Sequence, residues 1–276
     1  MESIINKVLQ AIQVSRNIDL WGYHNSLLNE KIQKRIDLLG LKNLAEYLNR
    51  LYSDEMESHT LIEEILIKVS NFFRNPIVFE IIGQNILPQI IESKINTGNH
   101  EIRVWSAGCA SGEEPYSIAI LINDLLENNI NNFTPFIFAT DISDEALKTA
   151  ASGLFPKKSL MDTKLRIIER YFTKTSTGFK IDPIIQNMVK FSNDDLTSVK
   201  RFAPSESIFG TFDLILCRNV LIYFDDKLQD IVLEKLYRAL NKGGFLILGD
   251  CEFITEKISQ NLVKIDNRNR IFQKPL

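Results

Sequence analysis

The stretch at residues 104–117 reads Val104-Trp105-Ser106-Ala107-Gly108-Cys109-Ala110-Ser111-Gly112-Glu113-Glu114-Pro115-Tyr116-Ser117, which predicts a strand, a glycine loop and a helix in that order. Pro115 stands where proline is favoured, in the first turn of the helix. Gly108 and Gly112 lie in the loop, and their missing Cβ atoms let the backbone pass close to a ligand. A loop of this kind lies at the carboxyl end of a strand, which is the usual ligand edge of an open α/β sheet.

The glycine loop does not match the known sequence devices for binding a phosphate group. Its spacing is not Gly-x-Gly-x-x-Gly, and it does not end in Gly-Lys-Ser or Gly-Lys-Thr. Glu113 and Glu114 at the start of the helix would repel a pyrophosphate from the N-terminus that normally attracts it. A cationic ligand suits these carboxylates better.

Asp141 stands at the end of the next predicted strand, where folds of this type hydrogen-bond ribose hydroxyls. Taken singly, each acidic residue has an ordinary explanation, because Asp141 can begin a turn and acidic residues are favoured at helix N-termini. Taken together, the glycine loop, these acidic residues and the lack of a phosphate device indicate S-adenosylmethionine, a nucleoside that carries a sulfonium and an amino-acid group.

Short apolar strands alternate with helices from Glu101 onward, which is the pattern of a parallel sheet with crossover helices. The expected strands are Ile102–Ser106, Phe136–Thr140, Met188–Phe191, Phe212–Cys217 and Phe245–Leu248, with Arg270–Lys274 as a closing edge strand. The expected helices are Pro115–Leu126, Asp144–Ala151 after a Ser143 N-cap, and Lys227–Leu240, with Gly243 and Gly244 as its stop signal.

The chain divides into two parts that differ in the spacing of their apolar residues. Residues 1–80 form a predicted helical module and linker, because apolar residues recur there at spacings of three and four. Residues 81–276 form the predicted α/β domain. Within that domain, approximately residues 152–190 are too long for a simple loop and contain their own apolar and turn signals, so we expect an inserted subdomain.

The composition is that of an ordinary soluble globular protein, with 45% apolar and 24% charged residues in 276. The 32 basic residues against 35 acidic ones offer no positive field for a nucleic acid. Three widely spaced cysteines and three scattered histidines fit neither a disulfide framework nor a metal site, and we expect buried, reduced thiols. The N-terminus shows no signal-peptide pattern and no uncharged run approaches 18 residues, so a cytoplasmic location without membrane insertion is expected.

The sequence resembles the chemotaxis-receptor glutamate methyltransferases, the CheR family, and the resemblance extends over nearly the whole chain. Its most specific strings are Gly-Glu-Glu-Pro-Tyr-Ser at 112–117 and Cys-Arg-Asn-Val-Leu-Ile-Tyr-Phe at 217–224. The matching segments also include Phe72-Phe73-Arg74, Ala139-Thr140-Asp141-Ile142-Ser143 and Lys242-Gly243-Gly244-Phe245-Leu246. The resemblance implies a Rossmann-like class I methyltransferase sheet, an N-terminal all-α module and a small antiparallel β insertion.

The resemblance also implies a set of contacts with S-adenosylmethionine. Asp141 would bind the ribose hydroxyls and Glu114 would lie toward the methionine group. The other implied contacts are Ser70 and Arg74 in the linker, Asn219 and Val220 after the fourth strand, and Asp195 with Leu196 on the adenine side. The family usually has Asn-Leu where this chain has Asp195-Leu196, so Asn193 is an alternative for that contact.

The implied reaction is methyl transfer to a glutamate side chain, which gives a methyl ester and leaves S-adenosylhomocysteine. A carboxylate is already a nucleophile at neutral pH, so the protein has to supply positioning and charge management rather than a strong base. Arg74 would orient the cofactor and the incoming carboxylate, and Tyr223 would place its hydroxyl near the transferred methyl group. The chain would act as a monomer.

The implied partner is the helical cytoplasmic region of a chemoreceptor. Lys31, Lys34 and Arg35 form a basic stripe that could meet an acidic helix, and a solvated charged face is the alternative explanation. In some family members the insertion binds a receptor's C-terminal peptide by strand addition. Two other functions stay open, namely a methyltransferase of this fold with another protein or a small acid as substrate, and a non-catalytic module that binds S-adenosylmethionine.

Overall fold

A computed structural model describes residues 4–16, 18–66, 70–129, 133–207 and 210–276. The chain forms two compact units. Unit 1 consists of Met1–Ile67 and Ile222–Gln229, and unit 2 consists of Lys68–Leu221 and Asp230–Leu276. No helix among the described residues is long and apolar enough to cross a membrane.

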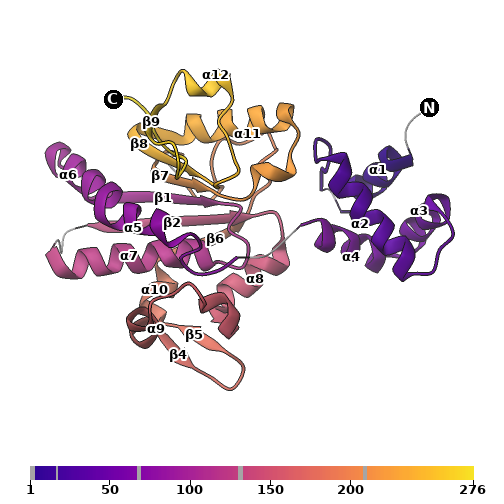
Figure 1. The fold of residues 1–276 in the computed structure, drawn as a ribbon, viewed down its shortest axis with the longest axis horizontal. Coiled ribbons are helices and arrows are strands. Elements are labelled where there is room, and N and C mark those ends of the chain that lie inside the picture. The colour runs from indigo at the N-terminus through magenta and orange to yellow at the C-terminus, as the bar shows by residue number, and fades with distance from the viewer. Residues whose placement is uncertain (1–3, 17, 67–69, 130–132, 208–209) are drawn as a thin grey trace. The chain divides into compact units, whose positions relative to one another are not determined.

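Unit 1 is built from helices with apolar faces turned inward, as the helical spacing predicts (Figure 1). Its helices are α1 (Ile4–Arg16), α2 (Asn25–Leu38), α3 (Leu44–Ser53) and α4 (Glu55–Ile65). The Asn43 side chain caps α3 and the Asp54 side chain caps α4 by accepting backbone N–H groups. The segment Ile222–Gln229 joins this unit, where the rings of Tyr23 and Phe224 meet edge to face at 5.0 Å.

The basic stripe expected on α2 is paired within unit 1. Arg35 binds Glu57 at 2.6 Å and Glu64 at 3.4 Å, and Lys34 binds Glu64 at 2.9 Å. Lys31 lies 3.6 Å from Glu30 on its own helix. Arg35 and Lys34 therefore link α2 to α4, while the Lys34 side chain stays 55% exposed.

Unit 2 contains a seven-stranded sheet, shown as near-parallel arrows in Figure 1. Its strands are β1 (Glu101–Ala107), β2 (Thr134–Asp141), β6 (Val189–Asn193), β7 (Phe212–Cys217), β8 (Leu240–Leu248), β9 (Val263–Asp266) and β10 (Ile271–Gln273). Their order is β6-β2-β1-β7-β8-β10-β9, and β10 runs opposite to the other six strands, so its pairs with β8 and β9 are antiparallel and the remaining pairs are parallel. The expected strands are confirmed, and the parallel strands bring their carboxyl ends to one edge.

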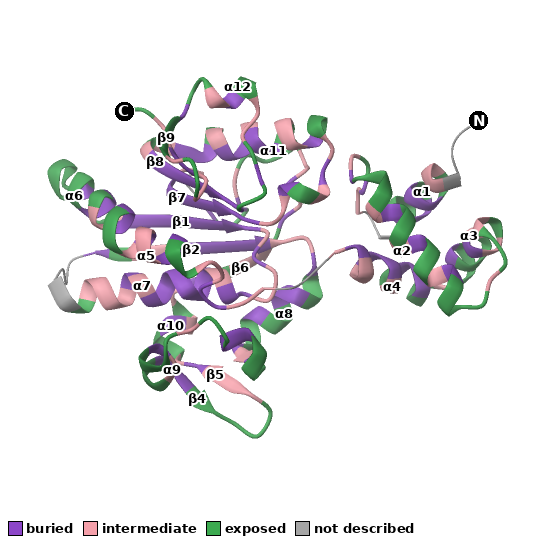
Figure 2. Ribbon diagram, viewed as in Figure 1, coloured by how far each residue is buried: buried purple, intermediate pink, exposed green. Residues whose placement is uncertain are grey.

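Helices bury both faces of this sheet, whose central strands are coloured as buried in Figure 2. They are α5 (Pro76–Ile81), α6 (Leu87–Thr97), α7 (Glu113–Asn129), α8 (Asp144–Ser152), α11 (Asp226–Ala239) and α12 (Glu256–Ser259). The expected Ser143 cap of α8 is confirmed. Between α5 and α6 a π turn covers Ile82–Ile86, because Pro88 cannot supply the amide hydrogen that the Gln84 carbonyl would accept in an α-helix.

The insertion contains the small antiparallel sheet that the resemblance implies, and its apolar side chains belong to the same core as the rest of unit 2. It contains β3 (Leu154–Phe155), a 3-10 turn at Lys157–Leu160, α9 (Leu165–Tyr171), β4 (Phe172–Lys174), β5 (Phe179–Ile181) and α10 (Pro183–Asn187). Its three strands make a small antiparallel sheet in the order β3-β5-β4. The ring of Phe72 packs edge to face on Phe155 and Phe172, at 4.8 and 5.0 Å, so the linker is held against this subdomain.

Two expectations about local structure are wrong, and one strand is additional to those expected. Gly243 and Gly244 lie inside β8 rather than stopping a helix, because α11 ends at Ala239 and the strand begins at the next residue. A Cβ on Gly244 would meet the carbonyl oxygens of Asn241, Phe212 and Asp213 at 2.9–3.2 Å, so close backbone packing requires this glycine. Strand β9 was not expected, and Cys251 is exposed whereas Cys109 and Cys217 are buried.

Strand β10 lies between β8 and β9 and is fastened at its end by Lys274. The Lys274 amide donates to the Gly244 carbonyl at 2.9 Å, and its ammonium donates to the carbonyls of Tyr237 and Leu240 at 2.9 and 2.8 Å. The ammonium therefore caps the C-terminus of α11, where a positive charge is favoured. Burial lowers the pKa of Lys274.

The packing around Gly112 leads to a first prediction. A Cβ there would lie 2.8 Å from the Cβ of Ala150, and the φ of +95° is strained for any other residue. Gly112→Ala should lower the free energy of unfolding by about 2–4 kcal/mol in urea titrations. Gly98→Ala is the matched control: its φ is +68° but nothing lies within 4 Å. That variant should lose only about 1 kcal/mol, and equal losses in the two variants would contradict the packing argument.

Candidate cofactor site

The glycine loop after β1 is fastened to the end of β2. The amides of Gly108 and Cys109 both donate to the Thr140 carbonyl, at 2.8 and 2.9 Å. The half-buried carboxylate of Asp141 accepts the amide of Ala110 at 2.8 Å and the amide of Ser143 at 2.9 Å. Asp141 thus lies beside the loop at the carboxyl edge of the sheet, where the sequence predicts a ribose contact.

The two loop glycines make room for protein atoms. A Cβ on Gly108, whose φ is +77°, would lie 2.4 Å from a Val220 methyl group, so the loop packs against the segment that follows β7. The space beside Gly112 is filled by Ala150 and Phe191. The interpretation of Gly112 as a point of close approach to a ligand is therefore wrong, because α8 and β6 occupy that space.

A buried ion pair joins the start of α7 to the end of β7. The Glu114 carboxylate lies 3.3 Å from the Arg218 guanidinium and accepts the Ser106 hydroxyl at 2.7 Å. Arg218 also donates to the Arg74 carbonyl at 2.9 Å, and its guanidinium lies 5.4 Å from the centre of the Phe79 ring. Burial raises the pKa of Glu114, whereas the neighbouring Arg218 lowers it.

Arg218 was not among the residues singled out from the sequence, although its side chain is only 2% exposed and bridges Glu114 to the linker. Its Nε atom is buried and has no hydrogen-bond partner among the residues that the structure describes. An arginine directly after a buried strand, in a string that also carries Asn219 and Val220, was the available signal.

Glu113 points to a different partner from its neighbour Glu114. Its side chain is buried and accepts the Ser159 hydroxyl of the insertion at 3.2 Å. Its other oxygen has no hydrogen-bond partner within the described part of the chain. Burial raises the pKa of Glu113 to about 7, against an ordinary value of 4.5. The first glutamate of the motif therefore belongs to the contact between α7 and the insertion.

The last residues of the motif hold the linker and α8. Tyr116 donates its hydroxyl to the Ala150 carbonyl at 2.9 Å. The Ser117 hydroxyl donates to the Glu113 carbonyl at 2.6 Å and accepts the amide of Phe73 at 3.0 Å. The first turns of α7 thus bind several other segments: Glu114 contacts β1 and Arg218, Glu113 the insertion, Tyr116 α8, and Ser117 the linker.

The contacts of Asn193 and Asp195, at the end of β6 and just after it, distinguish these two candidates for binding the adenine side of the cofactor. The Asn193 amide donates to the Ile142 carbonyl and to Asp144, both at 2.9 Å, and the buried Asp194 pairs with Lys235 at 3.1 Å. The half-buried Asp195 carboxylate accepts the amide of Thr197 at 2.8 Å and the hydroxyl of the same residue at 2.6 Å. Asn193 thus has a structural role, which favours Asp195.

The remaining predicted residues fall in four places. Leu196 is buried beside Asp195, and Ser70 and Arg74 are half-buried in the linker at the start of the described part of unit 2. Asn219 follows Arg218 with a left-handed φ of +60°. Tyr223 belongs to unit 1, where its carbonyl accepts the His24 amide at 2.9 Å.

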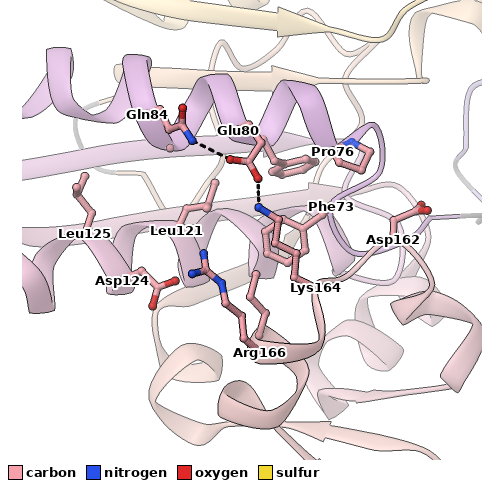
Figure 3. A pocket seen from close by; sticks show the side chains of 13 residues that line it. Phe73, Pro76, Glu80, Gln84, Leu121, Asp124, Leu125, Asp162, Lys164 and Arg166 are labelled. Carbon is pink, nitrogen blue, oxygen red and sulfur yellow. Dashed lines mark hydrogen bonds and ion pairs between the residues drawn. The ribbon is translucent and has the colours of Figure 1, made fainter.

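A separate cavity of about 260 Å³ is lined by α5, the π turn, α7 and the start of α9 (Figure 3). Phe73 and Leu121 contribute apolar surface, and Glu80 accepts the Gln84 amide at 3.0 Å and pairs with Lys164. None of the residues predicted to bind the cofactor lines this cavity.

Comparison with known families matches two models to the chain. The CheR methyltransferase all-alpha domain matches residues 4–66, and the CheR methyltransferase SAM binding domain matches residues 68–270. The chain belongs to the CheR methyltransferase family. S-adenosylmethionine is accordingly the cofactor of this CheR methyltransferase, and its fold is that of the class I methyltransferases with an N-terminal all-α domain.

Curated relatives of this CheR methyltransferase carry the same description over most of their length. It is similar to a chemotaxis protein methyltransferase of Borreliella burgdorferi, with 33% identity across 91% of this chain and 88% of the relative. A chemotaxis protein methyltransferase of Salmonella typhimurium is 30% identical across 89% and 82% of the two chains. Chemotaxis protein methyltransferase 1 of Pseudomonas aeruginosa is 29% identical across 82% and 81%.

The burial of Glu113 predicts a pH-dependent stability. Between pH 4.5 and about 7 the folded protein holds a proton that the unfolded chain has lost, so stability should fall as the pH rises through this window. Glu113→Gln removes the ionisation. Its stability relative to the unaltered protein should therefore increase by about 3 kcal/mol between pH 5 and pH 8 in urea titrations.

The exposed Glu169 on α9 offers a control for this measurement. Glu169→Gln should leave the difference from the unaltered protein the same at both pH values. A Glu113→Gln variant whose stability follows that of the unaltered protein at all pH values would show that Glu113 titrates normally.

Proposed function

We propose that this chain transfers the methyl group of S-adenosylmethionine to glutamate side-chain carboxylates of chemoreceptors, forming glutamate methyl esters. The observation that supports this most strongly is the family membership over both domains, together with relatives named as chemotaxis protein methyltransferases. The target region would be the helical cytoplasmic part of the receptor, and the reaction would take place in the cytoplasm.

The carboxyl edge of the sheet offers the hydrogen-bond acceptors that this cofactor needs. Asp141 and Asp195 are half-buried carboxylates after neighbouring strands, and both can accept hydroxyl and amino hydrogens of a nucleoside. Leu196, Asn219 and Val220 complete the proposed nucleoside and amino-acid contacts, with the Gly108 backbone beside them. The charges fit as well, since Glu114 and Asp141 favour a ligand that carries a sulfonium and an ammonium group.

The proposed reaction requires little proton transfer by the protein. When bound, the cofactor supplies a methyl group on a positively charged sulfur, which a substrate carboxylate can accept without first losing a proton. The buried thiols of Cys109 and Cys217 have pKa values raised by burial, so neither competes as a nucleophile. The protein's contribution is then to exclude water, to orient the two reactants and to balance their charges.

Arg74 and Tyr223 are the proposed catalytic residues, and Ser70 is a proposed cofactor contact. Arg74 would meet the incoming carboxylate with its guanidinium, while its backbone carbonyl is held by Arg218. The Tyr223 hydroxyl would approach the transferred methyl group. Arg218 has a supporting role here, because its guanidinium binds both the Glu114 carboxylate and the Arg74 backbone carbonyl and so holds them in place.

Methyl transfer can be measured directly with radiolabelled S-adenosylmethionine and purified chemoreceptor cytoplasmic fragments. The expected product is a methyl ester, which releases volatile methanol on treatment with base. Receptor fragments with glutamine in place of the methylated glutamates should take up no label. Transfer to unrelated acidic proteins at the same rate would contradict receptor specificity, and the absence of transfer to any protein would contradict the proposed reaction.

The role of Asp141 can be measured by calorimetry with S-adenosylhomocysteine. Asp141→Asn should weaken binding at least tenfold, about 1.4 kcal/mol, because one charged acceptor for the ribose is lost. Asp162→Asn, at an exposed position in the insertion, is the control and should bind as the unaltered protein does. Equal affinities for all three proteins would exclude Asp141 from the site.

A further inference from the structure

A buried carboxylate after β8 takes no part in the contacts proposed so far. Glu252 is only 2% exposed, and it accepts four backbone N–H groups. The donors are Asn219 at 3.0 Å and Gly249 at 2.5 Å to one oxygen, and Val220 and Leu221, both at 2.7 Å, to the other. Each oxygen therefore accepts two hydrogen bonds.

Three of these donors are consecutive residues of one turn. Successive amides that point to one side form a concavity that binds an anion, and here the carboxylate of Glu252 fills it. The left-handed Asn219, at φ +60°, is the residue that turns the chain there. Without Glu252 the Leu221 amide, in a buried residue, would lose its acceptor.

Gly249 shows how closely the carboxylate is enclosed. A Cβ at this position would lie 2.7 Å from Oε2 of Glu252 and 2.8 Å from the Asn219 nitrogen. Only a glycine lets the end of β8 approach the turn after β7 so closely.

The turn that Glu252 holds contains Asn219 and Val220, two of the proposed cofactor contacts, and it follows β7. Val220 packs against Gly108 of the glycine loop, and Arg218, immediately before the turn, pairs with Glu114. A shift of the turn would therefore move the Asn219 and Val220 contacts and disturb the packing on the glycine loop together.

We propose that Glu252 is a positioning residue that fixes the Asn219–Leu221 turn in the conformation that binds S-adenosylmethionine. This inference rests on the proposed function. Glu252 acts through the backbone of the turn and does not contact the reacting atoms. Its loss should therefore weaken cofactor binding and leave the recognition of the receptor unchanged.

Glu252→Gln tests the proposal, because an amide keeps the size of the side chain but replaces one acceptor oxygen by a donor. The variant should remain folded by circular dichroism and bind S-adenosylhomocysteine at least tenfold more weakly. Its KM for the receptor fragment should not change. Hydrogen exchange at Asn219, Val220 and Leu221 should become faster. Glu252→Asp, which keeps both acceptor oxygens on a shorter side chain, should recover part of the affinity.

Glu256→Gln, at an exposed position on α12, is the matched control and should leave binding and exchange unchanged. If Glu252→Gln does not fold, Gly249→Ala provides the second variant, since its methyl group displaces the carboxylate; folded Gly249→Ala protein with unchanged affinity would overturn the proposal.

Unchanged affinity in folded Glu252→Gln protein, or a KM for receptor that rises as much as the cofactor affinity falls, would also overturn it. These outcomes differ from a failure of the proposed function, in which the unaltered protein itself would not bind S-adenosylhomocysteine or transfer a methyl group.

Discussion

The buried pair of Glu114 and Arg218 is the contact on which the carboxyl edge of unit 2 depends. It joins α7 to the residue after β7, and through Ser106 and the Arg74 carbonyl it also reaches β1 and the linker. Removing two charges from water is costly, and loss of one partner leaves the other buried and unpaired. The pair therefore forms only when all of these segments are in place. The site requires the pair, but the pair itself does not add to the stability of the fold.

The same edge holds three glutamates in three different environments; Glu113 and Glu252 are buried, and the Glu114 side chain is 12% exposed. Glu114 has a guanidinium, Glu252 has four backbone amides, and Glu113 has one hydroxyl and an oxygen without a partner among the described residues. Buried acids of this kind are concentrated at functional sites, where local stability is given up for a defined charge pattern. Their different partners explain how neighbouring residues of one motif serve the cofactor edge and the insertion separately.

Much of the fold was predictable because its signals are local. Apolar runs of strand length, the Ser143 cap and the long interval after α8 led to the correct strands, helix and insertion. Strand β9 was not predicted because its alternation of apolar and polar residues covers only four positions, Val263–Asp266, which is too short to distinguish from a loop. The pairing of Lys34 and Arg35 with α4, the place of Gly243 inside β8 and the packing at Gly112 depend on contacts distant in sequence.

The candidate site was predictable only in part, for the same reason. Asp141 ends β2 and Asp195 is the second residue after β6, whereas Glu252 is the fourth residue after β8 and has no motif of its own. Its role as an acceptor is visible only when the turn at Asn219 is in place. The position of β10 between β8 and β9 also bears on synthesis in the cell. A nascent chain cannot complete its sheet until residues through Lys274 have left the ribosome, so β8 has an unpaired edge open to misassociation until then.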